Sequence, residues 1–145
     1  MAKRTFTSVV ALQNYIESAC NKAVENAAKR IKDKLTEFID EQYYNDTGFY
    51  PNWYKRTETF LRSSAYEMLS STKAQIGIDT DSMHYSNNFS GEQVALWASE
   101  SMHGAPYYQT DTQSYWDAFL EWADENAVLI LREELQKQGL KIVNI

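Results

Sequence analysis

Several residue types are scarce in this chain of 145 residues, and each scarcity excludes a class of protein. The single cysteine, Cys20, cannot form an internal disulfide, and two histidines are too few for the usual zinc patterns. No stretch approaches the roughly 20 apolar residues of a membrane span, and the first residues lack the apolar run and cleavage site of a signal peptide. We therefore predict a soluble globular protein that stays in the compartment where it is made.

Lys and Arg are absent between Lys73 and Arg132. That stretch holds nine acidic residues, which are Asp79, Asp81, Glu92, Glu100, Asp111, Asp117, Glu121, Asp124 and Glu125, and the formal net charge of the chain is −6. Nucleic-acid binding needs clustered basic residues to neutralise phosphates. The one basic cluster, residues 29–34, is balanced by Glu25 and Glu37, so a solvated helix face is favoured over a phosphate contact. We expect one half of the protein to present a negative surface.

No glycine or proline occurs before Gly48, and apolar residues recur at gaps of three and four from Leu12 to Phe38. This spacing predicts a long helix within residues 1–43, capped by Thr5, Thr7 or Ser8. A helix of roughly 35 residues is about 52 Å long, whereas a compact domain of this size is about 38 Å across. Either the helix breaks partway, or another chain covers its surplus length.

Small residues line the middle of this predicted helix, namely Ala19, Cys20, Ala23, Ala27 and Ala28. They permit the close approach of a second backbone from another chain. Packing inside the monomer explains them equally well.

The helical period stops in residues 44–64, which form an ordered aromatic loop with a turn of helix near 59–63. Residues 65–86 are predicted to contain strands at 65–70 and 74–79, with a third candidate at 83–85 that includes His84. In the second strand Ala74, Ile76 and Ile78 alternate and are expected to face inward.

Two further helices are predicted from capping signals. Ser90 and Gln93 form a capping-box pattern for a helix within 90–103, with Gly104 as its stop. Asp111 or Thr112 caps a long helix over 112–138, which Gly139 ends. Residues 140–145 are expected to add a terminal strand at the sheet edge. The fold class is therefore α+β, a single domain over 1–145 with two long helices packed around a small, mostly antiparallel sheet.

Catalytic patterns are weak in this sequence. His103 lies near Ser99, Glu100 and Ser101, but no nucleophile elbow is present, so a loop or surface histidine is favoured over a hydrolytic site. The segment Asp79-Thr80-Asp81 resembles the start of a calcium loop, yet Met83 occupies the third ligand position. We expect no enzyme activity, no cofactor and no bound metal.

The segment from Tyr50 to Thr57, with Leu61 and Ser64 after it, resembles the Tyr-x-Pro-x-x-Tyr-x-Arg-Thr-Gly-x-Leu stretch of a phage protein family. That family comprises neck and tail-completion proteins of long-tailed double-stranded DNA phages. The resemblance extends to 114–119 and 135–139, and so covers most of the chain from Leu12 to Ile142. The chain departs from the family pattern at Glu58, which replaces a glycine, and at Pro51, which is one residue closer to Tyr50.

The resemblance implies a structural virion protein at the head–tail junction, made in the host cytoplasm. Its copies would form a ring between the head connector and the tail-tube protein, with DNA only passing through the channel. The motif residues are Tyr50, Pro51, Trp53, Tyr54, Arg56 and Thr57, and they serve either as a loop anchor or as a subunit interface. The alternative is a cytoplasmic binding module that recognises a basic partner or a peptide through its acidic face.

Overall fold

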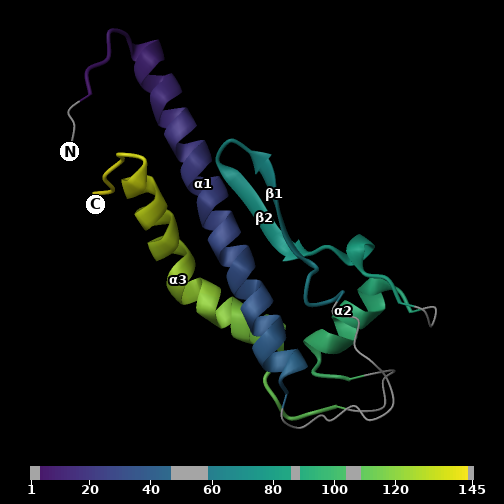
Figure 1. Ribbon diagram of the computed structural model, residues 1–145. Helices are drawn as coiled ribbons and strands as arrows, with labels where there is room; N and C mark the ends of the chain where they lie inside the picture. The colour runs from purple at the N-terminus through teal and green to yellow at the C-terminus, as the bar shows by residue number, and fades with distance from the viewer. Residues whose placement is uncertain (1–3, 47–58, 86–88, 104–108, 144–145) are drawn as a thin grey trace.

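The computed structural model describes residues 4–46, 59–85, 89–103 and 109–143, which form helices and one β-hairpin that packs on the longest helix (Figure 1). The elements, in chain order, are α1 (Val9–Ile39), η1 (Asp40–Tyr44), β1 (Ser64–Ser70), β2 (Lys73–Ile78), η2 (Thr80–Ser82), α2 (Gly91–Ser99) and α3 (Tyr115–Lys137). The predicted α+β class is confirmed, with a long helix near each end of the chain and a two-stranded antiparallel sheet.

Helix α1 begins where Ser8 caps it, because the Ser8 hydroxyl accepts a hydrogen bond from the Ala11 N–H at 3.1 Å. Its 31 residues extend over about 46 Å at 1.5 Å per residue. Helical structure continues beyond Ile39 as the π-helix η1, in which the Asn45 N–H reaches the Asp40 carbonyl at 2.8 Å. The sequence predicted a regular helix to about residue 43 and gave no sign of this wider turn.

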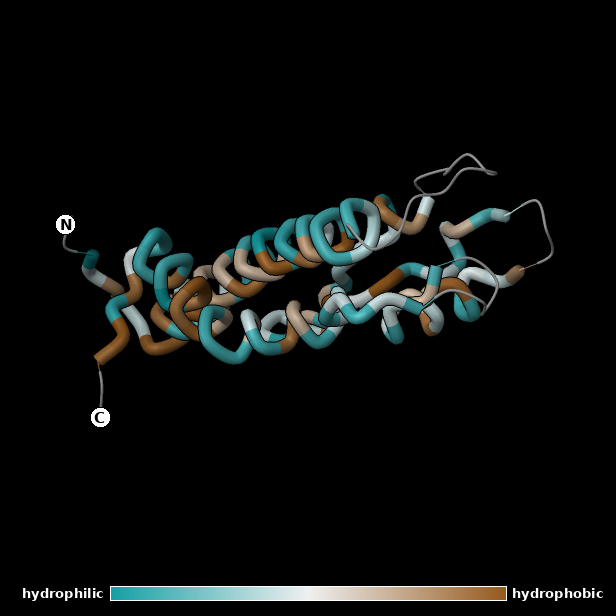
Figure 2. The backbone as a smooth tube through the Cα atoms, turned by 90° about the horizontal axis from the view of Figure 1, so that it is seen from below, coloured by the Kyte–Doolittle hydropathy of each residue, from teal (hydrophilic) through white to brown (hydrophobic). Residues whose placement is uncertain are grey.

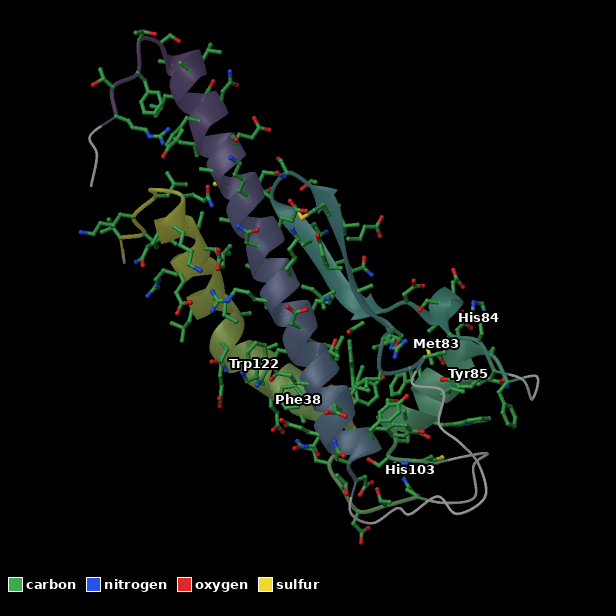
Figure 3. All side chains as sticks on the ribbon, viewed as in Figure 1. Phe38, Met83, His84, Tyr85, His103 and Trp122 are labelled. Atoms are coloured by element: carbon green, nitrogen blue, oxygen red, sulfur yellow. The ribbon has the colours of Figure 1, made fainter. Side chains whose placement is uncertain are left out.

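Helix α1 is the central element, with α3 along one side and the hairpin along the other (Figure 1). The small residues Ala19, Ala23, Ala27 and Ala28 are all buried within the single chain. Small side chains bring neighbouring backbones close, so the alanines serve packing inside the monomer, one of the two alternatives that the sequence left open. Near the other end of α1, Phe38 lies against Phe119 and Trp122 of α3, with ring centroids 6.4 and 6.3 Å apart (Figure 3).

The hairpin pairs Ser64 with Ile78 and Tyr66 with Ile76. Ala74, Ile76 and Ile78 are half-buried while Lys73 and Gln75 are exposed, as the alternation predicts. Residues 59–62 form hydrogen-bonded turns at the predicted turn of possible helix, without a helix of their own. The predicted third strand was wrong, because residues 83–85 follow η2 as irregular chain. His84 is consequently exposed beside the buried Met83 and is not part of a strand (Figure 3).

The capping predictions for the later helices were largely correct. Ser90 and Gln93 form both hydrogen bonds of a capping box at the start of α2. The prediction that Gly104 stops this helix was wrong, because α2 ends at Ser99 with Glu100 as its C-cap. Helix α3 is capped by Ser114 and not by the predicted Asp111 or Thr112, because the Thr112 hydroxyl donates a hydrogen bond to Asp46. The last helical residue is Lys137, and Gly139 with its positive φ stops the helix two residues later, as expected.

The hydrophobic core is concentrated toward the C-terminal half of α1. It joins Ile31, Leu35 and Ile39 of α1 to Phe60, Met83, Ala98, Tyr115 and Phe119. The Phe60 ring, only 1% exposed, makes edge contacts with Tyr43 and Tyr115 at centroid distances of 5.3 and 5.2 Å. We call this end of the molecule the closed end.

The predicted terminal strand over 140–145 is not formed in the residues that the structure describes, which end at 143. The physical reason is the position of the chain end. After Gly139 the chain passes the start of α1, whereas the hairpin lies on the other side of that helix (Figure 1). Residues 140–143 therefore have no strand edge within reach.

Candidate functional site

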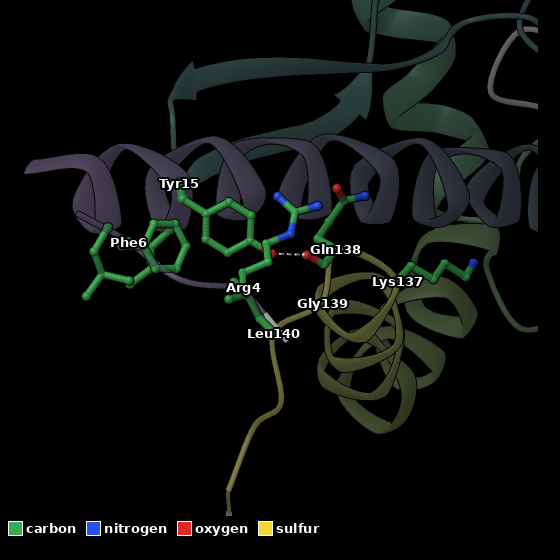
Figure 4. Close-up of a pocket in the computed structure, with 9 residues that line it drawn as sticks. Arg4, Phe6, Tyr15, Lys137, Gln138, Gly139 and Leu140 are labelled. Carbon is green, nitrogen blue, oxygen red and sulfur yellow. Dashed lines mark hydrogen bonds between the residues drawn. The ribbon is translucent and has the colours of Figure 1, made fainter. Parts of the chain in front are cut away.

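Both ends of the described chain meet at one end of the molecule, opposite the closed end (Figures 1 and 2). We call this region the tip and define it as residues 4–16 and 137–143. The Tyr15 hydroxyl of α1 donates a hydrogen bond to the Gln138 carbonyl at 2.9 Å, which joins the start of α1 to the end of α3 (Figure 4). These two residues are 123 positions apart in sequence, so no local pattern could have predicted the contact.

Gly139 sets the direction of the chain at the tip. Its φ is +86°, a left-handed conformation that glycine adopts at low energetic cost. The N–H of Leu140 bonds the Leu135 carbonyl at 3.0 Å and the N–H of Gly139 bonds the Gln136 carbonyl at 2.9 Å, the two hydrogen bonds of a Schellman motif. A Cβ added at Gly139 would lie 3.0 Å from the Tyr15 hydroxyl. Gly139 thus terminates α3 and also leaves room for the contact between Tyr15 and the end of α3.

An open pocket of about 490 Å³ lies at the tip between the two chain ends (Figure 4). The Arg4 guanidinium stands 4.7 Å from the centre of the Tyr15 ring, and Phe6 packs on the same ring with centroids 5.1 Å apart. Leu12, Ile16 and Leu140 supply the apolar part of the lining. The pocket thus combines an apolar floor with positive charge from Arg4 and Lys137.

The tip also exposes large apolar side chains to solvent. They are Val9, Val10, Leu12, Ile16, Ile142 and Val143, with Val9 and Val143 each 71% exposed. In Figure 2 the last described residues of the chain, at the end that carries the termini, are coloured as hydrophobic. Exposed apolar surface of this kind marks interaction sites in folded proteins.

An ion-pair network links α1 to α3 between the tip and the closed end. The Arg30 guanidinium contacts Glu133 and Glu134, each at 2.9 Å, and Lys137 reaches the same Glu134 oxygen at 2.9 Å. Hydrogen bonds from Lys137, and then from Arg30, lower the pKa of the buried Glu134 against the opposing effect of desolvation. The sequence analysis missed Glu134, which lies at a position where helical spacing alone predicts an ordinary surface residue.

The closed end contains a buried polar cluster. Nε2 of His103 lies 2.9 Å from Oδ2 of Asp46, and neither side chain has any exposed surface. Thr110 and Thr112 donate hydroxyl hydrogen bonds to the two carboxylate oxygens of Asp46, and the Tyr43 ring stacks on His103 at 4.5 Å. The cluster ties the end of η1 to the segments after α2 and before α3.

The two serines near His103, Ser99 and Ser101, both donate hydrogen bonds to backbone carbonyls. The Ser101 hydroxyl donates to the Thr112 carbonyl at 2.7 Å, and the Ser99 hydroxyl donates to the Leu96 carbonyl at 2.6 Å. Ser101 has a φ of +58°, which turns the chain so that His103 enters the core. The expectation of a loop or surface histidine is therefore corrected in one respect: His103 is in a loop, but it is fully buried (Figure 3).

The six predicted motif residues Tyr50, Pro51, Trp53, Tyr54, Arg56 and Thr57 lie outside the described residues, as does Gly104. The described residues that flank the motif are firmly placed. Asp46 precedes it in the buried cluster, and Phe60 follows it in the core. The Leu61 N–H donates to the Tyr44 hydroxyl at 3.2 Å across the same junction.

The nine acidic residues between Lys73 and Arg132 all lie on the surface. They occupy η2, α2, the segment before α3 and the first half of α3. Over the described ranges, no group of three His, Cys, Asp or Glu side chains could hold a metal ion. None of the described helices is long and apolar enough to cross a membrane.

One family model, described as YomN, matches residues 8–138, which include every helix and strand that the structure describes. No curated protein and no solved structure matches the chain. The matched range contains the long helices, the hairpin and the acidic stretch together. The chain therefore belongs to the YomN family, whose phage-type name indicates a protein of phage origin.

Proposed function

We propose that this protein is a structural component of the phage virion at the head–tail junction. Its copies would form a ring that joins the head connector to the tail tube around the DNA channel. The observation that carries the proposal is the tip, where Val9, Val10 and Val143 remain in solvent although the described helices and strands pack together. Apolar surface left open at the end of a helix pair is what a subunit contact would cover.

The charge distribution is compatible with a channel for DNA. All nine carboxylates of the acidic stretch are exposed, and no Lys or Arg lies among them in the sequence. Carboxylates repel phosphates, so a wall of this kind lets DNA pass without retaining it. The alternative function, an acidic-faced binding module, uses the same carboxylates but gives no role to the exposed apolar tip.

The proposal is tested by complementing a phage that lacks the gene and viewing the particles by electron microscopy. Without the protein, we expect filled heads and complete tails that do not join. Expression of wild-type protein should restore joined particles, and antibody labelling should mark the junction. Normal joining without the protein would contradict the proposal, and would favour a module that acts in the infected cell.

A pair of matched variants tests the role of the tip. Val10→Asp places a charge in the exposed apolar surface at the start of α1, where an acidic residue is favourable to the helix dipole and spares the fold. Leu69→Asp makes the same kind of change on β1, at a residue that is 47% exposed. We expect the first variant to fail in complementation and the second to succeed. Equal success of both would argue against a contact at the tip.

A further inference from the structure

The outward side of α3 is a second exposed surface with apolar residues. Positions 117, 120, 121, 124, 125, 128 and 129 follow helical spacing and share one side of the helix. All seven side chains are exposed, and they comprise Asp117, Leu120, Glu121, Asp124, Glu125, Val128 and Leu129. We call them the outer face of α3. The opposite side of the helix is buried through Phe119 and Ile130, so the outer face has no partner among the described residues.

The tip and the outer face share apolar character but differ in the sign of their charge. The tip carries exposed Arg4, Lys137 and Lys141 around its apolar residues, and it contains no acidic residue. The outer face carries four carboxylates around Leu120, Val128 and Leu129 and contains no basic residue. The two surfaces lie on different parts of the molecule, one at the end of the helix pair and one along its side.

We propose that the tip of one copy docks on the outer face of α3 of the next copy. If two tips met, Arg4 and Lys141 of one copy would face Arg4 and Lys141 of the other. If two outer faces met, the four carboxylates of one copy would face the four carboxylates of the other. Like charges set against each other disfavour both symmetric pairings. The remaining pairing matches apolar with apolar and cation with carboxylate, and it uses a different surface on each copy.

A contact of this heterologous kind leaves a free tip at one end of every assembly and a free outer face at the other. It therefore propagates from copy to copy, and it closes into a ring where the rotation between successive copies divides the full circle. The inference rests on the proposed function, because it specifies which surfaces the copies in the ring use. It also assigns the pocket beside Tyr15 to an apolar side chain of the neighbouring copy.

Charge reversal on each surface tests the docking in the full-length protein. The tip variant is Arg4→Glu with Lys141→Glu, and the face variant is Asp124→Lys with Glu125→Lys. Sedimentation velocity at about 0.05 M salt, where screening is weak, reports the size of the assemblies. We expect each variant alone to self-associate at least about tenfold more weakly than wild type, because like charges then face each other.

Mixing and combining the variants distinguishes this pairing from a general loss of assembly. In an equimolar mixture, the reversed tip of one variant meets the reversed face of the other, and the two unchanged surfaces also match, so assemblies in which the variants alternate should form. All four substitutions in one chain should restore assembly. A control with Glu67→Lys and Lys73→Glu, both exposed on the hairpin, should assemble as wild type. Circular dichroism confirms that each variant is folded.

Three results would overturn the inference: wild-type protein that stays monomeric at its highest soluble concentration, reversed variants that assemble normally, or a mixture of the two variants that does not assemble. Failure of the proposed function has a different signature. Heads and tails that join without the protein would refute the virion role even if the charge-swapped surfaces pair as expected. Conversely, if the protein is found at the junction but the charge reversals do not change its assembly, the virion role would stand and the proposed docking contact would be refuted.

Discussion

The closed end and the tip differ in how they are stabilised, although the same two helices run through both. At the closed end, aromatic rings around Phe60 and the buried Asp46–His103 pair fix several chain segments at once. At the tip, α1 and α3 are joined chiefly by Tyr15 and Gln138, and apolar residues face solvent. The difference indicates that residues of the same chain bury the apolar side chains at the closed end, whereas those at the tip remain available for contacts with another molecule.

The largest effect should come from removing the central ring of the closed end. Phe60→Ala leaves a cavity among Tyr43, Tyr44 and Tyr115, so we expect the free energy of unfolding to fall by about 4 kcal/mol. Urea denaturation measures this loss. The exposed Leu120 provides the control, since Leu120→Ala should change stability by less than about 0.5 kcal/mol. Similar losses for both variants would contradict the concentration of stability at the closed end.

Breaking the buried polar cluster should have the next largest effect. Asp46→Ala leaves His103, Thr110 and Thr112 without the carboxylate that they contact, and we expect a loss of about 3 kcal/mol. Chemical denaturation of Asp111→Ala, which removes an exposed carboxylate nearby in the chain, should show almost no change. Should Asp46→Ala prove as stable as wild type, the cluster would not be what ties the three segments together.

A smaller effect is expected from the helix end at the tip. Gly139→Ala forces an alanine to adopt a φ of +86° and should lower stability by about 1 to 2 kcal/mol. Gly77 on β2 is a matched control, because its φ is not positive and an added Cβ would meet nothing within 4 Å. Thermal unfolding should separate the two variants. A neutral Gly139→Ala would show that the tip adjusts without strain.

The smallest effect should appear in the acid dependence of stability. The pKa of Glu134 is lowered in the folded protein, so its contribution is complete above the ordinary value of 4.5 and is lost as the pH falls further. Because Arg30 and Lys137 are largely exposed, solvent screening limits this contribution to about 1 kcal/mol. As the pH falls below 4.5, the free energy of unfolding of Glu134→Gln should decrease less than that of the wild-type protein. An unchanged slope in Glu134→Gln would contradict a contribution from this carboxylate.

Local signals allowed much of this fold to be predicted. The hydroxyl of Ser8, the capping box of Ser90 and Gln93, and the position of Gly139 each depend on residues a few positions apart. The alternation of Ala74, Ile76 and Ile78 likewise reports on one strand alone. Each of these features depends only on residues that are close together in the sequence, so the sequence alone predicts it.

The candidate surfaces depended on contacts that no local pattern contains. Asp46 and His103 are 57 positions apart, and Tyr15 and Gln138 are 123 positions apart. The sequence around His103 predicts a loop, but it contains no sign that the distant Asp46 carboxylate pairs with the imidazole in the core. The exposure of Val9 and Val143 is also a tertiary property, because their burial depends on whether another element happens to reach the tip.

The π-helix at the end of α1 has a consequence for the rotational phase of the chain. Its hydrogen bonds join residues five apart, so the turn accommodates one residue more than an α-helical turn. One residue corresponds to about 100° of rotation around a helix axis. The extra residue therefore determines the rotational position at which the Tyr43 ring stacks on His103 and from which Asp46 reaches the same imidazole.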